Sequence, residues 1–278
     1  MAEEFLCGLI GAGIQGSRSP ALHQTEARAQ GLKLTYRLID LEVLGVGVEA
    51  LPRLLGNAVR EGYCGLNITF PCKQAVMPLL QSVSEEAGAI GAVNTVVIAG
   101  GKCTGYNTDG PGWAWGFRRA LPGADLTRVV LLGGGGAGSA CADAVLRLGA
   151  RALIIVDRES GRAAELAARM NAIHGSRCQA ADIDEALPGA TGLIHATPTG
   201  MTGIGGMPLP AELLNSRLWV SDIVYVPLET ELLKAAKRAG CRVMDGGHMN
   251  VGQALGGFKL FTGRDADPAR MDAHFRSL

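Results

Sequence analysis

Two ionisable residues of the chain, Lys73 and Asp109, could move a proton at a bound hydroxyl group. Lys73 follows a short apolar stretch at 65–68, and Asp109 closes the polar string 107–109 behind a second predicted strand. Ligands of open α/β sheets bind beyond the carboxyl ends of the strands, so both side chains stand where a ligand is expected. Each residue also has an ordinary interpretation. Lys73 could be a solvated lysine at a helix start, and Asp109 a turn residue, because Asp before Gly-Pro favours turns.

A glycine-rich turn indicates where a second reactant could bind. Gly133, Gly135 and Gly138 have the spacing G-x-G-x-x-G and follow an apolar strand predicted at 129–132. In this pattern the first glycine allows a tight turn, the second admits a pyrophosphate against bare backbone, and the third lets helix and strand pack closely. The helix predicted at 139–148 would direct its free N–H groups toward the turn, which favours an anion there. We expect a dinucleotide site, with a purely structural glycine turn as the alternative.

The strand after that helix bears on the choice of cofactor. It covers 152–156 and leads to Asp157, nineteen residues past Gly138, where a carboxylate can accept hydrogen bonds from an adenosine ribose. Such a carboxylate also repels a 2′-phosphate, so NAD is favoured over NADP. Arg158 and Arg162 could still clamp that phosphate, which keeps NADP open as the alternative.

A nicotinamide cofactor needs a partner group that takes or gives a proton when hydride leaves a hydroxyl-bearing carbon. Lys73 is the candidate, acting as general base in the oxidising direction and as general acid in reverse. A nearby carboxylate favours the charged form of a lysine, which cannot accept a proton. Lys73 and Asp109 are therefore expected to share the proton as a unit.

Composition argues against several classes of partner. The 26 basic and 26 acidic residues balance to a net charge of zero, which gives no electrostatic reason to expect nucleic acid or an anionic membrane. The first residues are acidic where a signal peptide would be basic, and no apolar run approaches the roughly 20 residues of a membrane span, so a cytoplasmic location is expected. The 7 cysteines show no C-x-x-C spacing and the 5 histidines no H-x-x-x-H pair, so we expect neither a disulfide framework nor a metal site.

Alternating strands and helices must position these residues. Before residue 109 the patterns predict strands at 5–10, 35–39, 65–68, 92–98 and 102–106 and helices at 19–30, 48–61 and 74–80. Ser19 is expected to cap the first helix through its hydroxyl, with Pro20 at the first helical position. The segment 109–112 breaks the pattern. After it, strands at 129–132, 152–156, 192–196, 219–224 and 242–244 alternate with helices, which is typical of a parallel, doubly wound sheet.

Eight short motifs follow one another along nearly the whole chain. They are Ser17–Pro20, Asn67–Lys73, Gly91–Thr95, Asn107–Gly110, Gly133–Gly138, Ala196–Met201, Asp222–Pro227 with Thr230, and Gln253–Ala254. Together they resemble the shikimate dehydrogenase family, most closely its quinate/shikimate dehydrogenase branch. His195 stands where that family often has asparagine, and Cys72 where it often has an aromatic residue or histidine; neither is given a role.

The resemblance implies an α/β fold of two domains. An N-terminal open α/β substrate-binding and catalytic domain would comprise residues 1–111, completed by the C-terminal helices of 247–278 that return to it. A doubly wound Rossmann-type domain that binds NAD(P) would comprise residues 112–246.

The resemblance also implies a reaction and a set of site residues. The reaction is the NAD(P)-dependent interconversion of shikimate and 3-dehydroshikimate, and of quinate and 3-dehydroquinate, by hydride transfer at C3, within the shikimate pathway of aromatic amino acid biosynthesis. No metal is implied, and the chain would act as a monomer or homodimer on a small-molecule substrate. Lys73 and Asp109 would contact the reacting oxygen. Substrate binding would involve Ser17, Ser19, Thr69, Asn94, Tyr225 and Gln253. Cofactor binding would involve Gly133, Gly135, Gly136, Ala137, Gly138, Asp157, Arg158, Arg162, Thr197 and Met201.

Other interpretations stay open. The same fold could act on shikimate alone or on an amino analogue, and a non-catalytic dinucleotide-sensing binding protein would share the motifs. Single residues also have structural interpretations: Ser19 as a helix cap, Asn94 as a strand-end turn, Tyr225 as core and Gln253 as part of a solvated helix face.

Overall fold

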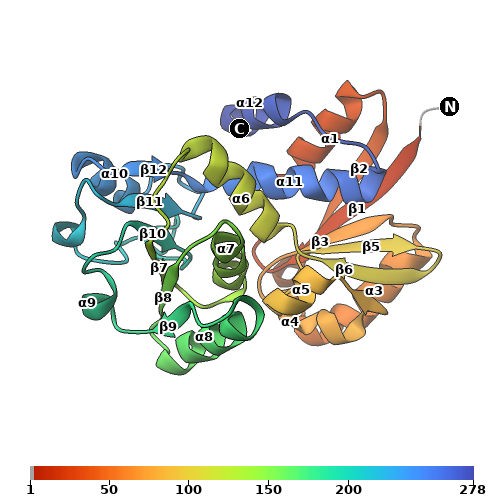
Figure 1. Cartoon of the computed structure of the whole chain (residues 1–278). Coiled ribbons are helices and arrows are strands. Elements are labelled where there is room, and N and C mark those ends of the chain that lie inside the picture. The colour runs from red at the N-terminus through yellow and green to blue at the C-terminus, as the bar shows by residue number, and fades with distance from the viewer. Residues whose placement is uncertain (1–2) are drawn as a thin grey trace. The chain divides into compact units, whose positions relative to one another are not determined.

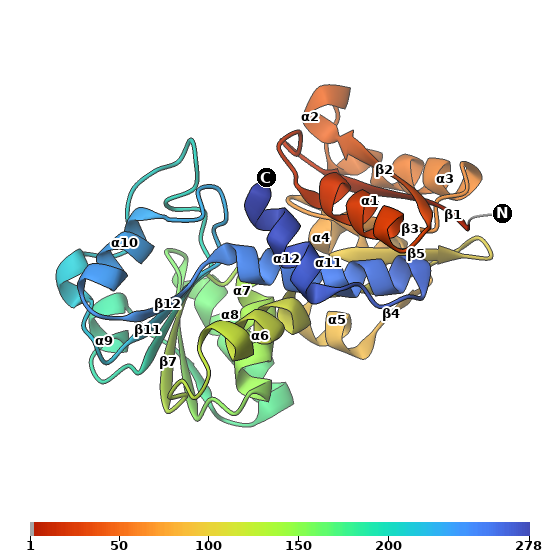
Figure 2. The same cartoon turned by 90° about the horizontal axis from the view of Figure 1, so that it is seen from above.

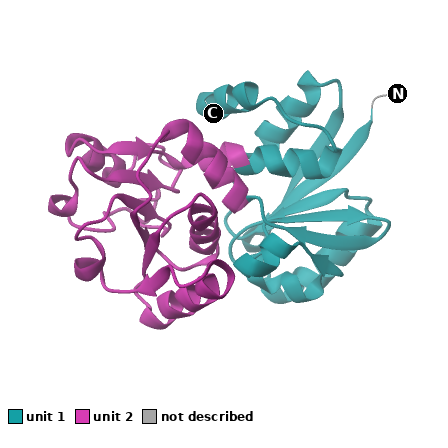
Figure 3. Cartoon of the chain, in the orientation of Figure 1, with its two compact units in different colours: residues 1–108, 253–278 teal, residues 109–252 magenta. Residues whose placement is uncertain are grey.

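The computed structural model describes residues 3–278, which form two compact units (Figure 3). Unit 1 contains the described residues up to Thr108 together with Gln253–Leu278, and unit 2 contains Asp109–Gly252. The chain passes between the units at the start of helix α6 (Asp109–Ala120) and within helix α11 (Gly246–Thr262). The sequence analysis placed these crossings at 111–112 and 246–247.

Unit 1 is built on a six-stranded mixed sheet. Its strands are β1 (Glu4–Gly11), β2 (Lys33–Asp40), β3 (Gly65–Ile68), β4 (Ser82–Val83), β5 (Thr95–Ala99) and β6 (Lys102–Tyr106), in the order β2-β1-β3-β5-β6-β4. β1 pairs in parallel with β2 and β3, whereas β5 is antiparallel to both β3 and β6. Gly100 and Gly101 connect β5 to β6 with positive φ angles, which glycine adopts without strain. The two strands predicted at 92–98 and 102–106 thus form a hairpin.

Helices cover both faces of this sheet (Figures 1 and 2). α1 (Ser19–Ala29), α11 and α12 (Pro268–Ser277) lie on one face, and α3 (Leu51–Arg60), α4 (Cys72–Ala75) and α5 (Glu85–Ile90) lie on the other; the short α2 (Leu41–Leu44) follows β2. The spacing of Leu51, Leu54 and Leu55 along α3 points all three into the core. α11 packs so closely on β3 that a Cβ at Gly65 would lie 2.3 Å from the Phe261 ring. The C-terminal helices therefore complete unit 1, as predicted.

Unit 2 is a doubly wound Rossmann sheet. Its strands are β7 (Arg128–Leu132), β8 (Ala152–Val156), β9 (Cys178–Ala180), β10 (Gly192–His195), β11 (Trp219–Asp222) and β12 (Arg242–Met244). All are parallel, in the order β12-β11-β10-β7-β8-β9, which places the topological switch point between β7 and β10. Its other helices are α7 (Gly136–Arg147), α8 (Ser160–His174), α9 (Ile183–Ala186) and α10 (Glu231–Arg238). The α/β architecture inferred from the sequence is confirmed.

Three local predictions were wrong. Ser19 is the first residue of α1 rather than its cap: Arg18 occupies the cap position, and the Ser19 N–H lies 3.3 Å from Ser17 Oγ. The segment 109–112 is not a break but the first turn of α6, where Pro111 removes an N–H that has no helical partner. The helix predicted at 74–80 is divided into α4 and a 3-10 turn at Met77–Leu79, because Pro78 cannot continue an α-helix.

Candidate active site

The carboxyl ends of β1, β2 and β3 lie at one edge of the unit 1 sheet. Because β5 runs antiparallel to β3, it begins at this edge, and β6 ends there. The edge therefore carries the loop after β1, the segment Thr69–Lys73 after β3, Asn94 before β5 and Thr108 after β6. Ligands of open α/β sheets bind at such an edge.

Asp40, the last residue of β2, organises the loop that carries Ser17. Its carboxylate accepts hydrogen bonds from the backbone N–H of Gly13 and of Ile14, both at 3.0 Å, and from the side chain of Gln15 at 2.9 Å. These hydrogen bonds, that from Gln15 foremost, lower the pKa of Asp40. Stabilising hydrogen bonds to a charged carboxylate hold the loop after β1 in one conformation.

Ser19 adjoins a buried polar network. Its side chain hydrogen-bonds the phenol of Tyr36, whose hydroxyl donates to Asn67 Oδ1 at 2.6 Å. Burial raises the pKa of Tyr36 well above its usual value, so the phenol stays neutral. Asn67 Nδ2 donates in turn to Thr95 Oγ1 at 3.0 Å. The network holds the side chains of Tyr36, Asn67 and Thr95 in place below the carboxyl edge of the unit 1 sheet.

Asn94 belongs to the same network and is 2% exposed. Its Oδ1 accepts from the Thr108 N–H at 2.7 Å and from the Thr95 hydroxyl at 3.0 Å. Its Nδ2 donates to Thr108 Oγ1 at 3.0 Å and to Gln253 Oε1 at 3.3 Å. Gln253 of α11 is therefore not a residue of a solvated helix face; it meets Asn94 at the edge.

Lys73 lies half-buried in the short helix α4. Its carbonyl accepts the N–H of Val93 at 2.9 Å, which ties α4 to the segment that carries Asn94. Thr69 is fixed by its N–H bond to the Ile10 carbonyl at 2.9 Å. Cys72, which precedes Lys73, is buried, and burial raises the pKa of its thiol to about 11. Lys73 and Thr69 thus belong to one rigid segment beside an unreactive thiol.

In unit 2 the glycine turn has the geometry expected of a dinucleotide loop. Gly133 adopts φ 99°, and a Cβ at Gly138 would lie only 1.9 Å from the Gly133 carbonyl oxygen. Gly135 is exposed at the N-terminus of α7, and a Cβ there would meet nothing within 4 Å of the described chain. Exposed backbone at a helix N-terminus suits a pyrophosphate, so these residues fit the dinucleotide. Gly136 and Ala137 form the first turn of α7.

Asp157 follows β8 and faces this turn. Its Oδ2 accepts the Gly134 N–H at 2.7 Å and its Oδ1 the Glu159 N–H at 2.9 Å. Arg162 lies 3.7 Å from Asp157 and 2.7 Å from Glu159, so two carboxylates already surround its guanidinium. Arg158 is exposed.

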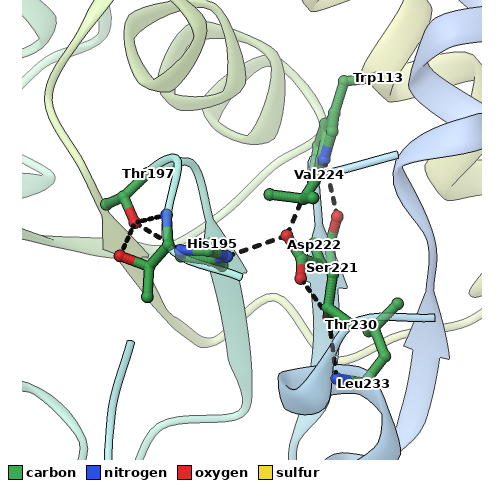
Figure 4. A network of polar contacts seen from close by, with 9 residues as sticks. Trp113, His195, Thr197, Ser221, Asp222, Val224, Thr230 and Leu233 are labelled. Carbon is green, nitrogen blue, oxygen red and sulfur yellow. Dashed lines mark hydrogen bonds and ion pairs between the residues drawn. The ribbon is translucent and has the colours of Figure 1, made fainter. Parts of the chain in front are cut away.

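Two loops follow β10 and β11. Thr197 lies half-buried and Met201 exposed in the loop 196–206, and Tyr225 lies half-buried, not in the core, in the loop 223–230. His195 and Asp222, the last residues of the two strands, hydrogen-bond at 2.9 Å between Nδ1 and Oδ1 (Figure 4).

The predicted site residues are divided between the two units. Unit 1 brings together Lys73, Ser17, Ser19, Thr69, Asn94 and Gln253; unit 2 carries Asp109, Tyr225 and every predicted cofactor residue. The sequence analysis missed Tyr36, Asp40 and Asn67, and gave no role to His195. Among the residues that the structure describes, no group of three or more His, Cys, Asp or Glu could hold a metal ion, and no helix is long and apolar enough to cross a membrane.

Comparison with known proteins identifies the family. A family model described as the shikimate dehydrogenase substrate binding domain matches residues 9–96. A protein of Streptomyces avermitilis named shikimate dehydrogenase (NADP(+)) is 51% identical over 99% of this chain and 96% of its own length. The chain belongs to the shikimate dehydrogenase family. Within it, the Corynebacterium efficiens protein named quinate/shikimate dehydrogenase (NAD(+)) is 44% identical over 99% of both chains.

A solved structure of the family has the same fold. The quinate dehydrogenase from Corynebacterium glutamicum in complex with NAD aligns with a TM-score of 0.93 and 43% identity, covering 99% of this chain and 100% of the other. The recognition of the family from its motifs is therefore confirmed, including its quinate/shikimate branch.

Proposed function

We propose that this chain is an NAD(P)-dependent dehydrogenase that interconverts shikimate and 3-dehydroshikimate, and quinate and 3-dehydroquinate. The observation that carries the proposal is its full-length similarity to proteins named for both activities. The glycine turn at the switch point of the unit 2 sheet supports the cofactor, and the polar edge of unit 1 supports a small hydroxylated acid as substrate.

Lys73 and Asp109 are proposed to handle the proton. In oxidation the Lys73 amine would take the proton of the C3 hydroxyl, and in reduction its ammonium would return it. Asp109 is 2% exposed. It is proposed to share the transferred proton with Lys73, so that the two residues act as a unit. Bound NAD(P) would supply the hydride acceptor.

The remaining residues of the unit 1 edge would orient the substrate. Ser17, Ser19 and Thr69, with Tyr225, would hold the carboxylate and its neighbouring groups through neutral hydroxyls. Asn94 and Gln253 would bind ring hydroxyls. The Asn94 amide is held by Thr108 and Thr95, and a ring hydroxyl bound at its Nδ2 would take the place of Gln253 Oε1.

Asp157 favours NAD. Both of its oxygens are directed by backbone N–H groups of the turn and of residue 159, so the carboxylate is held where it would meet the ribose hydroxyls. The 2′-phosphate of NADP would either displace the Asp157 carboxylate or lie next to it and be repelled. Arg162, paired with Glu159, is already partly neutralised.

A second candidate is a shikimate dehydrogenase that uses NADP. It is favoured by the 51% identity to a relative of that name, against 44% to the quinate/shikimate relative. Cytoplasmic location, pathway role and the monomer or homodimer state stay predictions.

One spectrophotometric panel tests the proposal. Shikimate and quinate are each oxidised with NAD and with NADP, and reduced cofactor is followed by absorbance. We expect turnover of both substrates and a higher kcat/KM with NAD. Turnover of shikimate alone with NADP would establish the second candidate, and cofactor binding without any turnover would show a dinucleotide-binding protein instead.

A further inference from the structure

A fully buried imidazole and carboxylate terminate neighbouring strands of unit 2. His195 of β10 and Asp222 of β11 are register partners in the parallel pair, and both have 0% exposure (Figure 4). A buried charged group is tolerated only when hydrogen bonds satisfy it, so the partners of Asp222 determine what this pair can do.

Asp222 accepts hydrogen bonds from three residues. They come from His195 Nδ1 at 2.9 Å, from the Val224 N–H at 3.0 Å and from the Thr230 hydroxyl at 2.7 Å. Thr230 also caps α10 by accepting the Leu233 N–H at 3.2 Å. The carboxylate therefore closes the loop 223–230, which carries Tyr225, and joins it to β10.

The second ring nitrogen of His195 bonds the loop that follows β10. Asp222 accepts at Nδ1, which leaves Nε2 for a hydrogen bond with Thr197. Thr197 Oγ1 lies 2.6 Å from Nε2 and 3.1 Å from Thr199 Oγ1. Thr197 Oγ1 also accepts the Thr199 N–H at 3.3 Å. Hydrogen bonds to His195 and Thr199 thereby fix the rotamer of Thr197.

Thr197 packs directly on the dinucleotide turn. A Cβ at Gly133 would lie 2.9 Å from Thr197 Cγ2 and 2.7 Å from the Ala196 carbonyl oxygen. The Ala196 N–H donates to the Leu132 carbonyl at 2.7 Å, immediately before Gly133. A displacement of Thr197 would therefore change the wall beside the glycine turn.

We propose that His195 is a positioning residue for the cofactor: its imidazole fixes Thr197 against the glycine turn and, through Asp222, joins this loop to the loop that carries Tyr225. The inference rests on the proposed cofactor site of unit 2. His195 would contact neither cofactor nor substrate. It would act on cofactor binding through the hydroxyl group of Thr197.

The test is a mutant cycle read by cofactor binding without turnover. NADH is titrated into the full chain and binding is followed by fluorescence. In H195N an amide can still donate to Asp222 but is too short to reach Thr197, and T197V removes the hydroxyl while leaving the His195–Asp222 pair. We expect each to raise the Kd for NADH roughly five- to tenfold, as loss of one hydrogen bond does, and the double variant to be no weaker than either. T197S restores the hydroxyl and should recover most of the loss.

His174 provides a matched control. It forms another His–Asp pair in unit 2, with Asp143 at 2.7 Å, and the Asp143 carboxylate also accepts from Arg147 of the same helix at 2.8 Å. H174N should lower the thermal midpoint and leave the Kd for NADH unchanged. If H195N fails to fold, the Kd values of T197V and T197S for NADH are compared instead.

Two results would overturn the inference. Additive losses in the double variant would mean that His195 and Thr197 act separately, and an unchanged Kd in T197V would mean that the hydroxyl positions nothing. A wild-type chain that binds NADH but oxidises neither substrate would refute the proposed reaction and leave this inference standing. A chain that binds neither NADH nor NADPH would refute both.

Discussion

Gly138 and Gly135 should respond differently to the same substitution by alanine. A Cβ at Gly138 would lie 1.9 Å from the Gly133 carbonyl oxygen, where ordinary contacts begin at 3.4 Å. The obstructing atom belongs to the backbone, so the turn itself must open. Overpacking costs about 1–3 kcal/mol when side chains can yield, and we expect about 3 kcal/mol here. For a protein of this size that lowers the thermal midpoint by roughly 6–12 °C.

Gly135 faces open space and adopts φ −72° and ψ −170°, a conformation that alanine accepts. G135A should therefore change the stability of the cofactor-free chain by less than about 1 kcal/mol, since a more restricted unfolded chain offsets a slightly poorer helix cap. Its methyl group would occupy the surface on which the pyrophosphate is expected, so the Kd for NADH should rise at least tenfold.

Thermal unfolding without cofactor, together with a titration of NADH, separates the two effects. G138A should lose both stability and binding, and G135A should lose binding alone. If G135A binds NADH like the wild type, the pyrophosphate does not bind against the backbone of Gly135. A G138A chain of wild-type stability would show that the close approach of the turn is not a constraint.

Three further outcomes are expected. K73M should lower kcat roughly 10²- to 10⁴-fold with little change in substrate KM, and an active variant would remove Lys73 from the mechanism. D40N should raise the KM for substrate about tenfold and leave the KM for cofactor unchanged. In the carboxylate one oxygen accepts from the Gly13 and Glu42 N–H groups and the other from the Ile14 N–H and the Gln15 side chain, whereas an amide nitrogen accepts from neither pair. Equal changes in both KM values would contradict this. Burial lowers the pKa of His23 from 6.5 to about 4. Between these two pH values the unfolded chain binds a proton at this histidine and the folded chain does not. The free energy of unfolding should therefore fall by about 3 kcal/mol as the pH drops through that interval. Denaturant titrations at several pH values measure this fall, which H23L should reduce; an equal slope in H23L would assign it to other groups.

The sequence predicted those features whose geometry depends on residues that are close together in the chain. The glycine turn, its helix and Asp157 lie within a single β-α-β segment, and the spacing of their residues already implies the geometry that Gly133 and Gly138 show. The hairpin at Gly100–Gly101 is local in the same sense. The errors at Ser19 and at 109–112 are also local, but there glycine, serine and proline are compatible with both a turn and the first turn of a helix, and packing decides.

The residues that hold the loops were missed because their partners come from distant parts of the chain. Asp40 reaches Gly13 across the β1–β2 pair, and His195 meets Asp222 only through the register of β10 and β11. No spacing rule connects such residues, but they share one feature: each is a buried polar residue at the end of a parallel strand. An apolar residue would be the ordinary choice there, since the side chain is out of water. A histidine or aspartate in that position therefore indicates a donor or acceptor needed by the loop that follows, and the loops after the carboxyl ends of strands are the ones that bind ligands.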